Sequence, residues 1–361
     1  MATSPNYAWA EPDNSSLVKN GAQDIRALGD AIDTSVWNIG LGQAGKNKII
    51  NSDFGIWQRG TSFTFTGSSG FTADRFEGSS GSGGVAVFSR QTFTPGTDPV
   101  NGYAGTYYID ANYTTSGTST IMLENKIEDV TTFANQPVRF SFWAKVSTGT
   151  HSVTPESVQR FGSGGSSAVV AAGPAVTLTT AWQRFGVSIS VPAITGKTVG
   201  AGSSTSFRLN IGTSGVKTFS IWGWQAEYGS KATPFQTASG GSPQAELAMC
   251  QRYYWRQTVD STGDRFCMGM NTTTTNAQMF VQYPVTMRTQ PSAIETNGTA
   301  SDYTISQGAT STACDAVPTF SGATTQTGLF NATLASGLTA GAVVMLRAAN
   351  ANPFIGWSAE L

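Results

Sequence analysis

The spacing of apolar residues changes once along this chain, near Lys46. From Leu17 to about Ile39 apolar side chains recur with a helical period, and after Lys46 they alternate with polar residues in many short runs. Alternation with a period of two is typical of a half-buried strand, and strands of this kind need a second layer to cover their apolar face. The sequence therefore predicts a mainly β fold preceded by one helix.

Composition supports many short strands joined by tight turns. Only 12% of the 361 residues are charged, 41 residues are glycine, and aromatic residues make up 11%. The aromatic content argues against disorder, and the length is sufficient for a sizeable core. The net charge of −1 gives no basic field that would attract nucleic acid or an anionic membrane, whereas sparse charge is compatible with assembly surfaces.

Residues 1–14 form a predicted extended segment, because Pro5 and Pro12 disfavour helix around them. Tyr7 and Trp9 would be wasteful as exposed aromatics in so short a tail, which favours a docking peptide for another protein. A frayed terminus is the alternative.

Residues 15–45 combine a predicted oligomerisation helix with a glycine-rich hinge, 41–45. Apolar residues recur at seven-residue intervals, with one more at an intermediate position: Val18, Ile25, Leu28, Ile32 and Ile39. This series is typical of a coiled-coil seam, although Gly21 and Ser35 weaken it. Self-association would bury the stripe, and packing of the helix on its own β domain is the alternative.

The stretch from Lys46 to Phe76 reads as strands around a polar corner. Trp57 and Arg59 lie in its first half, and Asp74 and Arg75 lie near its end. We interpret these residues as a structural motif, a sheet corner tied by charge-assisted hydrogen bonds in which Asp74 pairs with an arginine.

Several segments carry a family resemblance. They are INSDFGIWQRGTSF (50–63), FTADRF (71–76), RFSFWAK (139–145), AWQRFGVSISVP (181–192), IWGWQAEYGSKATPF (221–235), ELAMCQRYYW (246–255) and the terminal FIGWSAEL. In this order they resemble the jelly-roll domain of bacteriophage tail and fibre proteins, which is similar to carbohydrate-binding modules. The resemblance implies a trimeric virion component that assembles in the host cytoplasm and acts outside the cell on host-surface glycans.

Two β domains follow from the pattern. Roughly eight strands between residues 46 and 237 predict a jelly-roll sandwich resembling a carbohydrate-binding module, with QTASGGSP (236–243) as the linker that ends it. Residues 238–361 predict a smaller β domain. No apolar run approaches the length of a membrane span, and the first residues lack a signal-peptide pattern.

Sugar binding would use aromatic faces flanked by polar side chains. The candidates are Tyr103, Tyr107, Tyr108, Tyr113, Trp222 and Trp224. Burial in the core or in a trimer interface is the alternative for each.

Catalytic constellations are missing from the sequence, so we predict no catalytic residue. His151 is the single histidine and stands in a predicted loop, while Glu124, Glu128 and Asp129 read as a solvated charge group rather than as a glycosidase pair. Three widely spaced cysteines, Cys250, Cys267 and Cys314, read as small buried residues.

No cofactor and no metal ligand set are predicted. Asp53 or Asp74 are the candidates for a structural calcium ion of the kind the resemblance implies, without a calcium-loop spacing.

Three functions remain in order of preference. The first is a trimeric fibre or tail appendage, attached by its N-terminus, whose β domains engage host-surface glycans. The second is a structural decoration or adaptor protein of the virion, and the third is a polysaccharide depolymerase.

Overall fold

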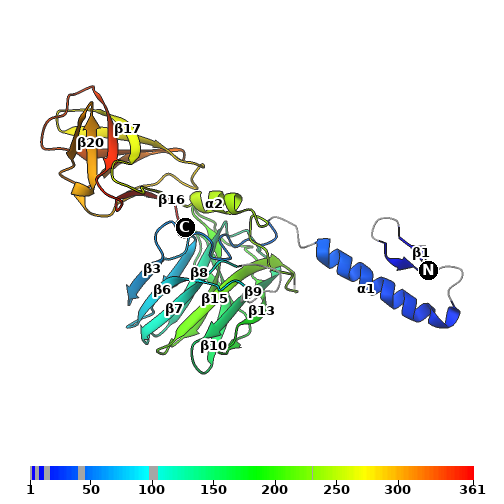
Figure 1. The fold of residues 1–361 in the computed structure, drawn as a ribbon. Coiled ribbons are helices and arrows are strands. Elements are labelled where there is room, and N and C mark those ends of the chain that lie inside the picture. The colour runs from blue at the N-terminus through cyan, green and yellow to red at the C-terminus, as the bar shows by residue number, and fades with distance from the viewer. Residues whose placement is uncertain (1, 5–7, 12–16, 40–44, 97–104, 230) are drawn as a thin grey trace.

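The computed structural model describes residues 2–4, 8–11, 17–39, 45–96, 105–229 and 231–361, and the fold is mainly β (Figure 1). The mainly β class expected from the sequence is confirmed. All the strand pairs that the structure describes are antiparallel. Among the described residues no helix is both long and apolar enough to cross a membrane.

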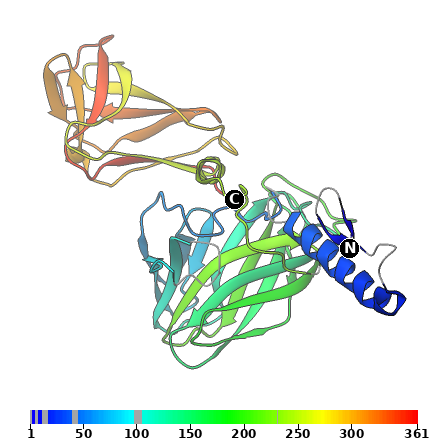
Figure 2. The same cartoon turned by 45° about the vertical axis from the view of Figure 1, so that its right-hand side comes forward.

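The N-terminal part stands apart from the β domains. A short hairpin, β1 (Ala2–Thr3) and β2 (Ala10–Glu11), precedes a turn of 3₁₀ helix (Val18–Asn20) and the long helix α1 (Gly21–Ile39). The hairpin lies against α1, where the Trp9 indole Nε1 donates to Ser35 Oγ at 2.8 Å. Figure 1 shows α1 to one side of the sandwich, and Figure 2 shows the same elements from a second direction.

The central domain is a sandwich of two antiparallel sheets. Its six-stranded sheet has the order β13-β9-β15-β7-β6-β3, and its seven-stranded sheet has the order β11-β10-β14-β8-β5-β4 with β12 paired to β10. The strands are β3 (Ser62–Thr66), β4 (Ser69–Phe71), β5 (Phe76–Ser79), β6 (Val85–Thr92), β7 (Tyr107–Thr115), β8 (Thr120–Glu128), β9 (Gln136–Val146), β10 (His151–Arg160), β11 (Val169–Ala172), β12 (Val176–Leu178), β13 (Gln183–Val191), β14 (Ser204–Gly212) and β15 (Thr218–Tyr228).

One apolar core fills the space between these two sheets. Phe140, Phe142 and Ala144 on β9 are fully buried in it, as the alternation in the sequence predicts. Trp143 points to the opposite, outer side of the sheet, where it packs against Trp222. The outer face of the six-stranded sheet therefore carries aromatic residues of its own.

The C-terminal domain begins with helix α2 (Pro243–Gln251), capped by the Ser242 hydroxyl, which accepts from Ala245 N. A three-stranded sheet, β16-β25-β19, and a seven-stranded sheet, β21-β20-β24-β17-β18-β23-β22, enclose a second core around Trp357. The strands are β16 (Tyr254–Thr258), β17 (Arg265–Asn271), β18 (Asn276–Gln282), β19 (Ile294–Glu295), β20 (Tyr303–Gln307), β21 (Thr310–Ala313), β22 (Thr319–Ala323), β23 (Thr327–Thr333), β24 (Val343–Ala348) and β25 (Phe354–Ser358).

The segment 236–243, expected as a linker, is held firmly on the sandwich. Gln236 N donates to Gln225 Oε1, Asn47 Nδ2 donates to the Gln236 carbonyl, and Ser239 N donates to Glu246 Oε2. The Gly- and Ser-rich composition suggested a linker, but these bonds from buried partners give the segment a defined path.

The motif residues Arg59 and Arg75 connect the two β domains rather than closing a corner of the sandwich alone. Both guanidinium groups pair with Glu360 near the C-terminus. Arg59 also lies 3.5 Å from the ring centroid of Tyr254, and Arg75 lies 3.5 Å from that of Tyr253. We call this cluster of Arg59, Arg75, Tyr253, Tyr254 and Glu360 the domain joint.

Asp74 supports the joint from the sandwich side, because the Gln58 amide that donates to it also donates to the Tyr254 carbonyl, whereas Trp57 packs on the sandwich core. Asp74 Oδ1 accepts from Gln58 N at 2.9 Å, so its hydrogen bonds come from Gln58 and not from the arginine expected. Burial raises the pKa of Asp74, against the hydrogen bonds from Gln58 and the charge of Arg59. The Trp57 indole donates to the Phe54 carbonyl at 2.6 Å and packs against the core.

Candidate functional site

The outer face of the six-stranded sheet gathers aromatic and polar side chains from neighbouring strands. Register places Ser89, Asp110, Ser220 and Lys145 in one row across β6, β7, β15 and β9. In the next row Trp222 lies opposite Trp143, and Trp143 lies opposite Arg184 of β13. Tyr108 begins the same row, one residue beyond the Ile109–Ile221 pair. We call this surface the outer face.

Half of the outer face is covered by the chain that follows β15. Phe235 packs on Trp222 with ring centroids 4.7 Å apart and on Trp143 at 5.8 Å. Arg184 lies 4.5 Å from the Trp143 ring centroid and donates to the Thr233 carbonyl at 2.6 Å. Trp222 is completely buried as a result, so it supports the surface without presenting a face to solvent.

The rest of the outer face, as far as the described residues show it, carries two half-buried rings, Tyr108 and Trp182. Their centroids lie 5.5 Å apart with planes nearly perpendicular, and Phe93 packs beneath both. Lys145 Nζ lies 5.3 Å from the Trp182 ring centroid. Phe93 thus holds the two rings from below while each keeps a part of its surface in water.

Polar groups adjoin these rings on the same sheet. Asp110 Oδ1 accepts from the Ser220 hydroxyl at 2.6 Å, and Asn112 Oδ1 accepts from Thr218 Oγ1 at 3.1 Å. Burial raises the pKa of Asp110, and the Ser220 hydrogen bond and the positive charge of Lys145 oppose that rise. This part of the outer face therefore combines aromatic surface with a carboxylate, an amide and an ammonium group, the groups that bind sugar rings and hydroxyls. We call this set of Tyr108, Trp182, Lys145, Asp110 and Asn112 the open site.

A β-bulge divides the two tryptophans of β15 between opposite faces. The register shifts between Trp222 and Gln225, and Gly223 has a φ of 65° there. A Cβ on Gly223 would lie 2.6 Å from the Trp143 ring, so glycine is required on both counts. Trp222 consequently faces outward while Trp224 points into the core against Phe76 and Phe140.

The sugar-binding candidates from the sequence separate into three groups. Tyr113, Trp222 and Trp224 are fully buried, which matches the alternative of a core position and leaves no face for a sugar. Tyr107 is half-buried under the Arg90 guanidinium, 4.3 Å from its ring centroid, whereas Tyr108 belongs to the open site. Tyr103 lies outside the described residues.

Sequence reasoning missed four residues of the open site: Trp182, Lys145, Asp110 and Asn112. Lys145 belongs to the outward-pointing set of RFSFWAK together with Trp143, and this alternation was the available signal. Trp182 precedes β13, and only the fold brings it next to β7 and β9.

The apolar stripe of α1 is exposed to solvent. Val18, Ile25 and Ile32 are 96%, 66% and 38% exposed, and Leu28 is half-buried. Ile39 ends the helix and its side chain, like Tyr7, lies outside what the structure describes. Packing of the helix on its own β domain, the alternative considered above, is not what the described part of α1 shows.

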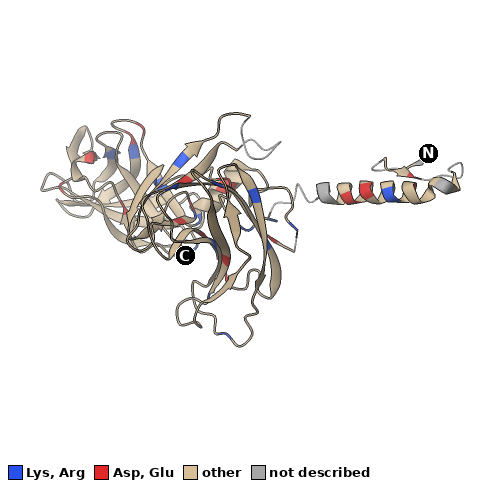
Figure 3. Ribbon diagram, turned by 90° about the horizontal axis from the view of Figure 1, so that it is seen from below, with Lys and Arg blue, Asp and Glu red and all other residues tan. Residues whose placement is uncertain are grey.

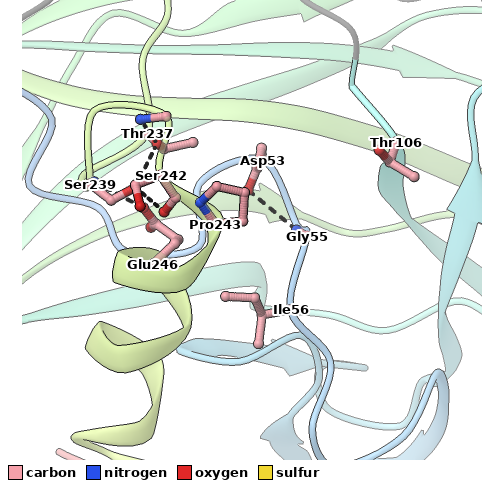
Figure 4. A pocket seen from close by; sticks show the side chains of 10 residues that line it. Asp53, Gly55, Ile56, Thr106, Thr237, Ser239, Ser242, Pro243 and Glu246 are labelled. Carbon is pink, nitrogen blue, oxygen red and sulfur yellow. Dashed lines mark hydrogen bonds between the residues drawn. The ribbon is translucent and has the colours of Figure 1, made fainter.

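A hollow with a volume of about 260 Å³ lies where α2 joins the sandwich. Figure 4 shows Asp53, Thr237, Ser239 and Glu246 around it. The Glu246 carboxylate accepts from Asn51 N at 2.6 Å and from Ser239 N at 2.9 Å. Because both of its oxygens accept backbone hydrogen bonds, this hollow belongs to the connection between the domains.

The other titratable residues considered in the sequence, His151, Glu124, Glu128 and Asp129, make contacts within the sandwich or to α2. His151 begins β10, half-buried, and its Nε2 lies 3.0 Å from the Ile211 carbonyl, so it is not the loop residue expected. Glu124 is buried and pairs with Arg160, so it does not belong to the solvated group expected, whereas Glu128 pairs with Arg252 and its side chain remains 38% exposed. Asp129 closes a turn by accepting from Thr131 N.

The cysteines and the residue types that bind metal ions are also candidates for parts of a site. Cys250 and Cys314 are buried and Cys267 is half-buried, all as free thiols. In the described ranges no three His, Cys, Asp or Glu side chains are grouped so as to hold a metal ion. Charged residues are sparse along the ribbon (Figure 3).

Comparison with known proteins gives structural neighbours only. No family model matches the chain, and no curated protein matches it. The structural neighbours include carbohydrate-binding modules.

One is the CBM22-2 xylan-binding domain of Paenibacillus barcinonensis Xyn10C, at 13% identity and a TM-score of 0.30, covering 50% of this chain and 98% of that domain. Another is the family 11 carbohydrate-binding module of Clostridium thermocellum, solved with a mixed-linked tetrasaccharide, at 13% identity and a TM-score of 0.29, covering 52% of this chain and 96% of that module. The Stig cyclase Fisc of Fischerella, at 10% identity and a TM-score of 0.33, covers 53% of this chain and 100% of its own. Likeness at this level says nothing about what this chain binds.

Proposed function

We propose that this chain is a non-enzymatic carbohydrate-binding protein and that the open site holds the sugar. The observation that carries the proposal is the convergence of half-buried Tyr108 and Trp182 with Lys145, Asp110 and Asn112 on one sheet face. In this proposal the sandwich is the jelly roll that the sequence resemblance implies, and its outer face is the surface that binds the sugar.

The chemistry of the open site suits a sugar held without being cleaved. A pyranose ring can stack its C–H face on the exposed part of Trp182 while its hydroxyls reach Lys145, Asp110 and Asn112. Among the described carboxylates of the outer face, Glu227 is only 2% exposed and accepts from Gln225 and Thr233, so it is not accessible to a sugar bound beside Asp110. This is the reason to favour binding over depolymerase activity.

Titration of the purified chain with host-type polysaccharides, by calorimetry or on a glycan array, tests the proposal. The variants Trp182→Ala and Tyr108→Ala should each weaken binding by roughly tenfold, the effect of losing about 1.4 kcal/mol of stacking. Tyr228→Ala is the matched control, because Tyr228 is an exposed aromatic at the far end of β15. Equal binding by all three variants, or no glycan bound by the wild type, would refute the site; the second result favours a structural decoration or adaptor role.

The assembly in which the chain works is proposed from α1 and from the sequence resemblance. The exposed Val18, Ile25 and Ile32 would be buried by α1 helices of other copies, which supports a homotrimeric coiled coil. Residues 1–14, with Tyr7 and Trp9, would attach this assembly to another virion protein. The chain would then be a phage fibre or tail appendage, made in the host cytoplasm and acting extracellularly.

The mass of the full chain in solution tests the assembly. We expect a trimer that dissociates when Ile25 and Ile32 are both replaced by aspartate. The fold of a single copy should be retained, because both positions are exposed to solvent. A wild-type chain that stays monomeric at high concentration overturns the trimer but leaves the open site intact.

A further inference from the structure

The C-terminal domain exposes apolar side chains on one side of its seven-stranded sheet. Four large hydrophobic residues of this sheet are exposed, Met268, Met270, Phe280 and Val343, at 66%, 52%, 50% and 69%; the fifth such residue of the domain, Leu247, lies on α2 and is 37% exposed. Exposed apolar residues scattered singly need no explanation, but a group confined to one face does.

Strand register shows that these residues form one continuous patch. Met268 of β17 lies opposite Phe280 of β18 on one side and Met345 of β24 on the other. Met270, two residues along β17, lies opposite Val343. Because residues two apart on a strand share a face, all five side chains lie on the side opposite the core. We call them the methionine patch.

A shallow hollow adjoins the patch. It has a volume of about 320 Å³, and Met268 and Phe280 share its lining with Trp255 and Gln257. Its walls could therefore receive an apolar side chain from a molecule that covers the patch.

The size of the patch indicates which partner fits. Side chains of this kind expose roughly 150–200 Å² each when free, so the four exposed residues contribute about 400 Å². A stable interface between independent proteins buries about 800 Å² on each partner. The methionine patch is thus too small to hold a free partner alone, but sufficient for a contact between molecules already linked elsewhere, where the effective concentration reaches millimolar values.

We propose that the methionine patch contacts the C-terminal domain of another copy of this chain within the assembly gathered by α1. This inference rests on the proposed self-association of α1. Two observations favour a second copy: the chain presents two separate apolar surfaces, α1 and the patch, and the patch residues carry no charge that would select a different partner. In a rotationally symmetric assembly a patch that faces the axis in one copy faces it in every copy, so the patches can meet at the axis.

The methionines themselves report on the contact. Hydrogen peroxide oxidises exposed methionine to the sulfoxide, and peptide mass spectrometry follows each site. In the full-length wild type we expect Met268 and Met270 to oxidise at least fivefold more slowly than in the Ile25→Asp/Ile32→Asp chain. Half-buried Met249 on α2 and fully buried Met279 are internal controls that should not differ between the two proteins.

The possible outcomes separate this inference from the proposed function. Equal oxidation of Met268 and Met270 in an oligomeric wild type overturns the patch contact alone. A monomeric wild type overturns the trimer, and the patch contact with it, while glycan binding at the open site stands. Protection that appears only after polysaccharide is added would assign the patch to the ligand instead of a second copy.

A patch variant gives an independent test. Replacing Met268 and Phe280 by glutamine changes only exposed positions, so the fold should be retained. We expect the assembly to form through α1 but to dissociate at a concentration at least tenfold higher than the wild type. Unchanged dissociation would contradict the proposal.

Discussion

Removing the negative charge of Glu360 from the domain joint should destabilise the protein. Arg75 and Glu360 pair with side chains that are only 1% and 6% exposed, and Arg59 contacts the same carboxylate at 3.3 Å. Burial lowers the pKa of Arg75 to about 10, which shows how strongly its environment disfavours the charge. The substitution Glu360→Gln leaves this guanidinium buried without its counter-charge.

The expected cost follows from the burial of the pair. Removing one partner of a buried ion pair typically costs 3–5 kcal/mol, and about 3 kcal/mol applies here because the glutamine oxygen still accepts a hydrogen bond. For domains of this size that cost corresponds to a fall of about 6–12 °C in melting temperature.

The matched control is Glu77→Gln. Glu77 and Lys126 form an ion pair at 3.2 Å whose side chains are 27% and 20% exposed, so its loss should cost less than about 1 kcal/mol. Both variants would be measured by scanning calorimetry, with limited proteolysis near residue 243 as a readout of domain separation. If Glu360→Gln melts within about 1 °C of Glu77→Gln, the joint does not stabilise the two-domain arrangement and the reasoning fails.

Two further predictions use single positions. His151 is the only histidine, and its imidazole should titrate by NMR with a midpoint below its ordinary pKa of 6.5, chiefly because burial disfavours the charged ring, with Lys217 acting in the same direction and the hydrogen bond to the Ile211 carbonyl opposing it. Because the pKa of His151 is lower in the folded state, His151 favours folding above pH 6.5, and this contribution is lost as the pH falls. The variant His151→Gln should therefore show a smaller fall in stability between pH 7 and pH 5. A titration midpoint at or above pH 6.5 would contradict the assignment. Gly223→Ala should lower the free energy of unfolding by about 2 kcal/mol and weaken glycan binding, because a positive φ and the Trp143 ring both oppose a Cβ at this position. Gly229→Ala is the control for backbone strain alone, because Gly229 has a φ of 105° but open space around it.

Local pattern predicted much of the sandwich. The alternation in RFSFWAK placed Phe140, Phe142 and Ala144 on the core side and Trp143 on the other, as the structure has them. The heptad series located α1 within a few residues of its bounds, Gly21–Ile39. Both signals arise from neighbours in the chain, so a single sequence contains them.

Long-range pairings could not be found in this way. Arg75 meets Glu360 across 285 residues, and Trp182 reaches Tyr108 only because β13 and β7 share a sheet. The bulge at Gly223 had a local signal, a glycine between two tryptophans, but its effect on Trp222 and Trp224 follows from the partner strand β9. Fixed alternation would have put both rings on one face, because residues two apart on a regular strand share a face.

The proposed assembly also explains how a small open site could serve adhesion. Two half-buried rings and three polar groups offer a modest contact, and single sites of this kind bind weakly because much of the stacking energy offsets the cost of immobilising the sugar. Copies joined through α1 convert later binding events into intramolecular ones, which raises the overall affinity by about 10²–10⁴ when the sites reach one surface together. That gain is larger when the sandwiches are oriented so that their sites face one surface, and the methionine patch, connected to the sandwich through the domain joint, would hold neighbouring copies in that orientation. Destroying the patch should therefore weaken binding to a polysaccharide surface far more than binding to a single oligosaccharide, and equal losses in the two assays would contradict this coupling.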